Sequence, residues 1–380
     1  MSPVVETEEH KALRAAVAAL GKRYGRAYLT AAIAEGRHPE ELWSEAAKLG
    51  YLGVNLPQAY GGGGGGIAEL SLVLEELGAA GCPLLMMVVS PAICGTVIAR
   101  FGTEDQKRAW LPGLADGTRT MAFGITEPDA GSNSHRLATK VRQDGDEWVL
   151  SGGKYYISGV DEVEAVLVVA MRPTGPALMI VPTDAEGLTY QPIEMDIVSP
   201  EKQFTMFFDD VRLPHDALVG KEDAGLAQLF AGLNPERIMA ASFATGMARR
   251  ALDKAAEYAR TRSVWGAPIG THQGLSHPLA QCAIQVELAR VMTQKAAALY
   301  DAGQDRAAGE SANMAKYAAG EAVAAAVDLA IQVHGGNGLS TEYGLASLLT
   351  ASRISRIAPV SREMILNYVA QHTLNLPRSY

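Results

Sequence analysis

The run TEPDAGS, from Thr126 to Ser132, follows the apolar segment TMAFGI at residues 120–125 and precedes alternating, strand-like sequence. Its Thr hydroxyl, its Pro-fixed turn and its Gly-Ser pair expose backbone amides and hydroxyl groups at one strand end. A strand end of this kind suits the polar edge of a cofactor. Taken alone, the run predicts a turn and no more.

The residue composition and the spacing of apolar residues change twice along the chain. Ala-rich segments with apolar residues three and four apart predict helices up to about Gly117. Short runs rich in Val, Ile, Tyr, Phe and Thr then predict strands, and helical texture returns after Asp223. We therefore expect a mainly α protein with a central β domain. The expected domains are an N-terminal helical domain (1–119), a middle β domain (120–223) and a C-terminal helical bundle (224–380), whose helical blocks are 226–262, 276–302, 307–334 and 342–373.

The composition favours a globular enzyme. The chain has 380 residues, of which 48% are hydrophobic, so it can bury a large core. Its net charge of -9 gives no general attraction to nucleic acid or to an anionic membrane. The scattered Cys82, Cys94 and Cys282 match no zinc spacing, so we expect no metal site. The first residues lack the pattern of a signal peptide, and we expect a cytoplasmic protein.

Two unusual segments have ordinary interpretations. The stretch from Leu77 to Ala99 carries no charge, but Pro83 and Pro91 interrupt it, which predicts a buried pair of short helices and not a membrane span. The six consecutive glycines at 61–66 precede a helix, yet no Lys-Ser or Lys-Thr follows them. We therefore expect a flexible loop there and not a phosphate-binding loop.

Four further segments accompany TEPDAGS: KYYISG at 154–159, RSVWG at 262–266, HQ at 272–273 and QVHGGNG at 332–338. In this order and at these long spacings, the five segments together resemble the acyl-CoA dehydrogenases. The resemblance implies a helical N-terminal domain, a β-barrel or sheet domain and a C-terminal four-helix bundle. It also implies an FAD cofactor.

The resemblance assigns roles around the flavin. Thr126 corresponds to a residue near the pyrimidine edge of the ring, and the segment 156–158 to one that lies against the ring, where the family usually has Trp, Ile and Thr. In that family the residues matching Arg262 to Gln273 act across a dimer interface. The implied FAD-binding residues are Phe123, Ile125, Thr126, Gly131, Ser132, Tyr156, Ile157, Ser158, Arg262, Trp265, His272, Gln273, Gln332, Gly335, Gly336, Ser361 and Glu363.

Dehydrogenation of an acyl thioester requires a carboxylate that removes the α proton. In many family members this base is a Glu in the final helical region, where this sequence has Pro359. A smaller set places the base in a Glu-Arg pair on the first helix of the C-terminal domain, and this chain has Glu236-Arg237 there. We therefore predict Glu236 as the base. Judged without the resemblance, Glu236 reads as an ordinary first-turn helical Glu after Asn-Pro.

The resemblance also implies the substrate and the partners. Ser132, Asn234 and Arg237 are expected to bind an acyl-CoA, with Asn234 standing where Asp is common. An electron-transfer flavoprotein is the expected electron acceptor, and the expected assembly is a homotetramer built as a dimer of dimers, with a role in fatty acid metabolism. His334 receives no chemical step, because a lone His beside a helix end more often packs.

Two alternatives remain open from the sequence. The missing late Glu favours a flavin oxidase or monooxygenase on the same scaffold, whereas Glu236 speaks against it. A non-catalytic partner subunit of a hetero-oligomeric dehydrogenase is the second alternative. The sequence does not identify the acyl group of the substrate, because residues such as Met86 and Met87 are equally suited to line an acyl pocket or to fill the core.

Overall fold

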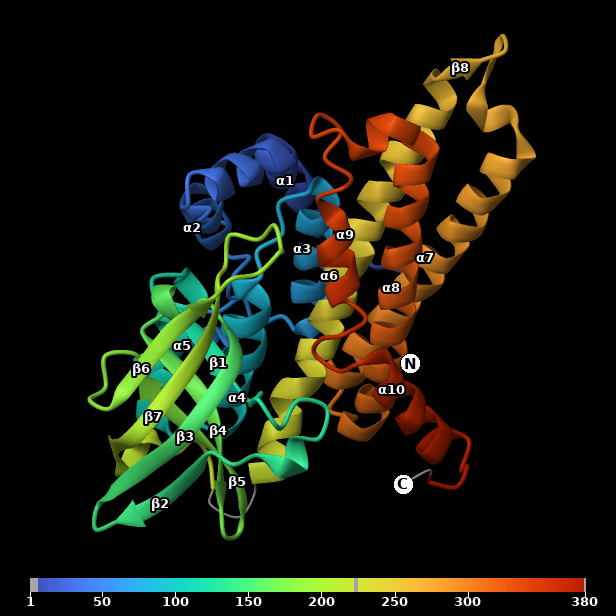
Figure 1. Cartoon of the computed structure of the whole chain (residues 1–380). Helices are drawn as coiled ribbons and strands as arrows, with labels where there is room; N and C mark the ends of the chain where they lie inside the picture. The colour runs from blue at the N-terminus through green and yellow to red at the C-terminus, as the bar shows by residue number, and fades with distance from the viewer. Residues whose placement is uncertain (1–5, 222–224, 379–380) are drawn as a thin grey trace.

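The computed structural model describes residues 6–221 and 225–378, and its elements follow the chain order of a helical part, a β-sheet domain and a second helical part. This order confirms the predicted fold class. Figure 1 shows the sheet at the lower left and α3 of the first helical part beside α6 of the second. The predicted boundary between residues 223 and 224 lies outside the described residues.

The N-terminal part consists of helices joined by short turns. Thr103 begins one of them: its hydroxyl accepts a hydrogen bond from the amide of Gln106, whose side chain in turn accepts one from the amide of Thr103, so that two free amides are satisfied. The elements are α1 (Glu8–Ala34), α2 (Glu40–Lys48), η1 (Gln58–Tyr60), α3 (Ile67–Ala80), η2 (Val88–Gly95), α4 (Thr96–Phe101) and α5 (Glu104–Asp116).

The uncharged stretch from Leu77 to Ala99 forms two buried helical pieces, as predicted. α3 ends at Ala80, and η2 is a π-helix that contains Pro91 and continues into α4. No helix within the described ranges 6–221 and 225–378 is long and apolar enough to cross a bilayer.

The six glycines form a loop, but a more ordered one than expected. The amides of Gly62, Gly63, Gly64 and Gly65 donate to the carbonyls of Pro57, Gly53, Leu56 and Val54, respectively. A Cβ atom on Gly62 would lie 2.2 Å from the carbonyl oxygen of Leu56. Close backbone packing therefore requires glycine at this position, in addition to any flexibility it provides.

The middle domain is a seven-stranded sheet in the order β1-β4-β2-β3-β7-β6, with β5 paired to β4. The segments WVLS (148–151) and KYYIS (154–158) are the two halves of one strand, β3. The register between β3 and β7 shifts after Lys154, and the irregularity places Tyr156 at φ 59°. The strands are β1 (Met121–Gly124), β2 (Lys140–Asp144), β3 (Glu147–Ser158), β4 (Ala165–Arg172), β5 (Gly175–Pro182), β6 (Leu188–Ile193) and β7 (Gln203–Pro214), with short helices η3 (Ser134–Arg136), η4 (Val160–Glu162) and η5 (His215–Ala217).

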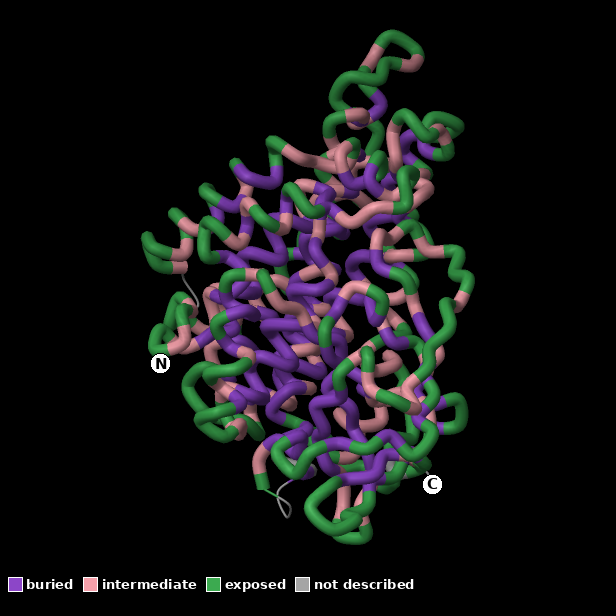
Figure 2. The backbone as a smooth tube through the Cα atoms, turned by 90° about the vertical axis from the view of Figure 1, so that its left-hand side faces the viewer, coloured by how far each residue is buried: buried purple, intermediate pink, exposed green. Residues whose placement is uncertain are grey.

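The C-terminal part is a bundle dominated by three long helices, α6 (Gly225–Thr261), α7 (Gln273–Asp301) and α8 (Asp305–His334). A hairpin of β8 (Ser263–Val264) and β9 (Ala267–Pro268), followed by η6 (Ile269–Thr271), joins α6 to α7. Buried alanines on α6 and α8 allow their backbones to pack closely, and α3 joins the same core. Figure 2 shows this buried interior, with the hairpin end exposed at the top.

The block 342–373, expected to be helical throughout, is interrupted. It contains α9 (Leu348–Ile354), α10 (Arg362–Tyr368) and η8 (Val369–Thr373), preceded by η7 (Gly335–Leu339). The break falls at residues 355–361, because Pro359 has no amide to donate and disfavours helix for the residue before it. Ser361 then starts α10 by accepting a hydrogen bond from the amide of Met364.

Candidate active site

The TEPDAGS run leaves the end of β1 and lies beside the end of β3. The amide of Tyr155 donates to the carbonyl of Thr126 at 2.8 Å, so the two segments predicted to contact a flavin are neighbours. Thr126 is half-buried, whereas Gly131 and Ser132 are exposed. Phe123, in β1, is buried in the core, and Ile125 is partly buried against the same cluster.

At the end of β3, alternate side chains point to different surroundings. Tyr156 is 49% exposed and its ring packs on that of Tyr155, with centroids 4.1 Å apart. Ile157 is buried in the sheet core. The Ser158 hydroxyl accepts a hydrogen bond from the side-chain amide of Gln203 at 2.9 Å. Tyr156 and Ser158 thus offer an aromatic surface and a hydroxyl at one strand end.

Glu236 lies well inside α6, which begins at Gly225 and continues through Pro235. The interpretation of Glu236 as a first-turn Glu is therefore wrong, since the helix starts more than two turns earlier. Glu236 is half-buried. Burial raises its pKa to about 7, and the charge of Arg237 opposes this shift.

The surroundings of Glu236 connect α6 to β1. The negative charge of Glu236 adds to burial in raising the pKa of Cys94, which places this thiol of η2 near the carboxylate. The Cys94 thiol in turn donates to the carbonyl of Ala122 in β1, at 3.4 Å. Cys94 thus connects the neighbourhood of Glu236 to β1, the strand that TEPDAGS follows.

Arg237 and Asn234 are both buried, and the Arg237 guanidinium donates to the Asn234 side-chain oxygen at 3.0 Å. The Nε atom of Arg237 is buried and has no hydrogen-bond partner within residues 6–221 and 225–378. Burial lowers the pKa of Lys316 to about 8, and the charge of Arg237 contributes to this shift. The Lys316 ammonium donates to the carbonyl of Val360, next to Pro359.

The last two predicted cofactor residues follow Pro359. Ser361 is half-buried at the start of α10, where its hydroxyl caps the helix. The Glu363 side chain is 70% exposed and pairs with the guanidinium of Arg362 at 3.2 Å. Glu363 is therefore a surface carboxylate, unlike Glu236.

The remaining predicted residues form a second group at the opposite end of the bundle. Arg262, His272 and Gln273 are exposed, and Trp265 at the hairpin tip is 92% exposed. Figure 1 shows this hairpin far from the sheet. Gln332, Gly335 and Gly336 are exposed at the end of α8, near α6, since Asn337 donates to the Tyr258 hydroxyl at 3.1 Å. One chain does not bring the two groups together.

Gly336 lies in open space just after the end of α8. A Cβ atom at Gly336 would meet no heavy atom within 4 Å, and its φ lies outside the left-handed region. Packing within the described residues therefore does not require glycine at this position. His334, two residues earlier, is buried and stacks on Tyr258 with ring centroids 4.2 Å apart.

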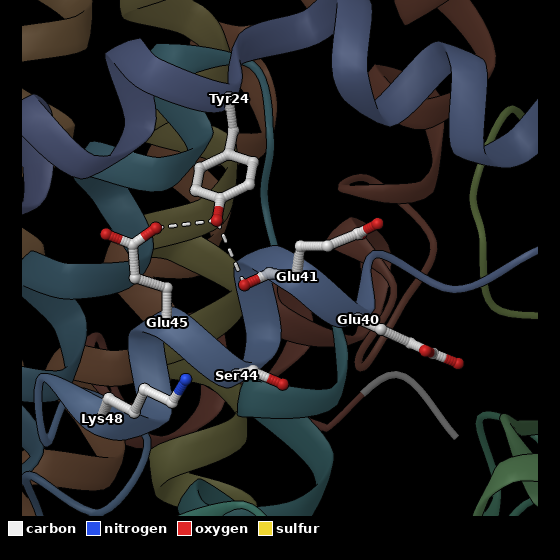
Figure 3. Close-up of a pocket in the computed structure, with 6 residues that line it drawn as sticks. All are labelled: Tyr24, Glu40, Glu41, Ser44, Glu45 and Lys48. Atoms are coloured by element: carbon white, nitrogen blue, oxygen red, sulfur yellow. Dashed lines mark hydrogen bonds between the residues drawn. The ribbon is translucent and has the colours of Figure 1, made fainter.

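A surface groove between α1 and α2 is a separate feature (Figure 3). Acidic side chains dominate it, and the Tyr24 hydroxyl donates to Glu45 at 2.7 Å. None of the predicted site residues lines this groove. The lining residues are Tyr24, Glu40, Glu41, Ser44, Glu45 and Lys48.

Comparison with known families gives matches along most of the chain. The family models for the N-terminal, middle and C-terminal domains of acyl-CoA dehydrogenase match residues 7–118, 122–211 and 223–374. The chain therefore belongs to the acyl-CoA dehydrogenase family of FAD-dependent oxidoreductases, and FAD is its cofactor.

Among its relatives, the chain is 63% identical to acyl-CoA dehydrogenase FadE12 of Mycobacterium tuberculosis H37Rv, over 99% of this chain and 98% of that protein. The structure of a glutaryl-coenzyme A dehydrogenase in complex with glutaryl-CoA superimposes with a TM-score of 0.92 at 27% identity, covering 99% of this chain and 97% of the other. A glutaryl-CoA dehydrogenase from Mycobacterium smegmatis in complex with FADH2 gives 0.91 at 25% identity, covering 99% and 97%.

Proposed function

We propose that this chain converts an acyl-CoA thioester to the 2-enoyl-CoA with Glu236 as the base. The observation that supports this most strongly is the environment of Glu236. Its carboxylate is half-buried beside Arg237 and has a pKa of about 7, whereas the alternative position holds Pro359. A base with a pKa near the working pH is well matched to proton abstraction.

In the proposed reaction, the α C–H bond breaks and its proton passes to the Glu236 carboxylate as the double bond forms. FAD, when bound, accepts the hydride that leaves the β carbon. Arg237 and Asn234, directly beside Glu236, bind the thioester and hold its α carbon toward the carboxylate, and Ser132 contributes from the loop. Burial around Glu236 keeps water away from this carboxylate, which preserves its basicity.

The two groups of cofactor residues support a site shared between two copies of the chain. The sheet-side group (Phe123 to Ser132, Tyr156 to Ser158, Ser361 and Glu363) would hold the ring of one FAD. The hairpin-side group (Arg262 to Gln273, Gln332, Gly335 and Gly336) would hold the diphosphate of the FAD bound to a partner chain. The exposed Arg262 provides the positive charge that a diphosphate requires. We propose a dimer of dimers on this basis.

The physiological setting follows from the same proposal. An electron-transfer flavoprotein would reoxidise the flavin, and the enzyme would act in the cytoplasm in fatty acid metabolism. Among relatives whose names state a substrate, one at 33% identity is a short-chain specific acyl-CoA dehydrogenase from Bos taurus, and another at 33% is a glutaryl-CoA dehydrogenase from Desulfococcus multivorans. These names define a first panel of acyl-CoA substrates to test.

The deciding experiment mixes FAD-loaded protein with the acyl-CoA panel under anaerobic conditions and follows the flavin absorbance. The wild type should bleach with at least one thioester, whereas Glu236→Gln should remain yellow and folded without bleaching. Glu257→Gln, an exposed Glu on the same helix, is the matched control and should bleach normally. Bleaching of Glu236→Gln at the wild-type rate would remove Glu236 as the base.

The same preparation distinguishes the alternatives. Rapid reoxidation of the bleached enzyme by air, with formation of peroxide, would favour an oxidase or monooxygenase. Little FAD binding and no turnover by the wild type alone would favour a non-catalytic partner subunit.

A further inference from the structure

A buried ion pair joins the two sheet-side segments that are predicted to contact the flavin. The Lys154 ammonium lies 2.7 Å from the Glu127 carboxylate, and their side chains are 0% and 6% exposed. Glu127 is the second residue of the TEPDAGS run, and Lys154 precedes the ring-side segment 156–158. The proposed chemistry does not use either residue directly.

On one side, Glu127 closes the base of a loop. Its carboxylate accepts hydrogen bonds from the amides of Ala138, at 2.6 Å, and Thr139, at 3.0 Å. The chain therefore departs from Glu127, three residues after the end of β1, and returns to the same carboxylate at Ala138. Residues 128–137, which include Gly131 and Ser132, are enclosed between these two points.

On the other side, Lys154 ties β3 to the start of the same loop. Its ammonium also donates to the carbonyl of Ile125 at 3.0 Å. The neighbouring amide of Tyr155 donates to the carbonyl of Thr126 at 2.8 Å. Residues 125, 126 and 127 are thus each bonded to residue 154 or 155, which fixes Thr126 relative to the end of β3.

Both charged side chains of this pair have hydrogen-bond partners in their buried site. Burial lowers the pKa of Lys154 to about 8, whereas the hydrogen bonds from Lys154, Ala138 and Thr139 outweigh burial and lower the pKa of Glu127. Both groups are therefore charged at neutral pH. Since apolar residues often replace a buried ion pair without loss of stability, a role in geometry explains this pair better than a role in stability.

We propose that Glu127 and Lys154 are positioning residues that set the loop 126–132 against the end of β3 and so define the shape of the FAD ring site. This inference rests on the proposed FAD site on the sheet. It assigns a function to the acidic residue of TEPDAGS, which the roles of Thr126 and Ser132 do not explain.

The test uses Glu127→Gln, Lys154→Met and the double variant in the FAD-loaded, full-length protein. We expect the FAD dissociation constant to rise about tenfold or more, as the loss of one charge-assisted hydrogen bond implies. The flavin absorption spectrum should shift, and kcat should fall more than KM rises. In Glu127→Gln, hydrogen exchange should accelerate at the amides of Ala138 and Thr139, because an NH2 group replaces one of the two carboxylate oxygens that accept from them.

Leu213→Ala is the control for general destabilisation. Leu213 is 1% exposed in β7 and pairs with Trp148, at the opposite end of β3 from Ser158. It should lower the melting temperature without changing FAD affinity or the exchange at 138–139. If Lys154→Met does not fold, Glu127→Gln provides the same measurements, because it keeps the size of the side chain and one oxygen acceptor while it removes the charge and the second acceptor.

Unchanged FAD affinity, spectrum and amide exchange in the folded variants would overturn the proposal. The exchange measurement requires neither substrate nor turnover. A wild type that fails to bleach with acyl-CoA would therefore contradict the proposed function, whereas wild-type exchange rates in Glu127→Gln would contradict the positioning role.

Discussion

Arg237 donates a hydrogen bond from its guanidinium to the side-chain oxygen of Asn234, 3.0 Å away and one turn earlier on α6. The pair is buried, and Asn234 also donates to the carbonyl of Asp305 at 3.3 Å. Glu236 lies between them in sequence. Asn234 is a neutral amide, and no carboxylate in the described part of the chain lies within ion-pair distance of Arg237. The charge of Arg237 is therefore not neutralised, and it acts on Glu236.

Asn234→Asp should change the pH dependence of the reaction. A carboxylate at this position would pair with Arg237 and weaken the influence that lowers the pKa of Glu236, so this pKa should rise above about 7. The acidic limb of kcat/KM against pH should move upward by roughly half a unit to one unit. Asn234→Ala removes the hydrogen bond without adding charge and should produce no upward shift. If the acidic limb of kcat/KM against pH does not move in Asn234→Asp, this electrostatic explanation is contradicted.

Glu236→Gln should make the folded protein more stable relative to the wild type as pH rises. Because burial raises the pKa of Glu236, the folded state retains a proton that the unfolded state has lost. This retained proton stabilises the folded wild type fully below the ordinary Glu pKa of 4.5, and the stabilisation is lost by about pH 7. The difference in melting temperature, Glu236→Gln minus wild type, should therefore grow between these two pH values and then level off.

Thermal melts at equal FAD saturation from pH 4.5 to 8.5 measure this difference. Glu257→Gln, which replaces an exposed carboxylate on α6, should show no comparable trend. A flat difference for Glu236→Gln would mean that Glu236 is not held protonated by the fold.

Mixed oligomers should reveal a site shared between chains. Glu236→Gln and Arg262→Ala should each be inactive alone, but their co-expression should restore activity, since one site in each mixed pair would combine an intact Glu236 with a partner's intact Arg262. Glu236→Gln mixed with Arg237→Ala should recover little, because both residues belong to the same side of the site. Absence of recovery in the first mixture would place a complete site within one chain.

Gly62→Ala should destabilise the protein by about 1–3 kcal/mol, because the added methyl group would overlap the Leu56 carbonyl oxygen and displace the loop. Gly274→Ala is the matched control: a Cβ atom there meets no heavy atom within 4 Å, and the change should stay within about 0.5 kcal/mol. Chemical denaturation of both variants measures the difference. Equal stability of the two variants would show that the hydrogen bonds of residues 62–65 contribute little.

Sequence patterns predicted the helices and strands that are determined by residues close to one another in the sequence. The apolar spacing located α6, α7 and α8 to within three residues at each end, because a helix that buries one face must repeat apolar residues three and four apart. The motif segments located the ends of β1 and β3. The break at 355–361 was missed, although Pro359 was visible, because the flanking segments both have helical texture.

The sequence by itself determined the order of the domains, the family and the identity of the candidate base, because these depend on residue types at particular positions along the chain. Only the tertiary structure decided that Glu236 lies inside a helix with its pKa near 7, that Lys154 is buried against Glu127, and that the hairpin lies away from the sheet. The physical reason is that desolvation and charge coupling arise from groups far apart in sequence, and no local pattern records which of them will meet.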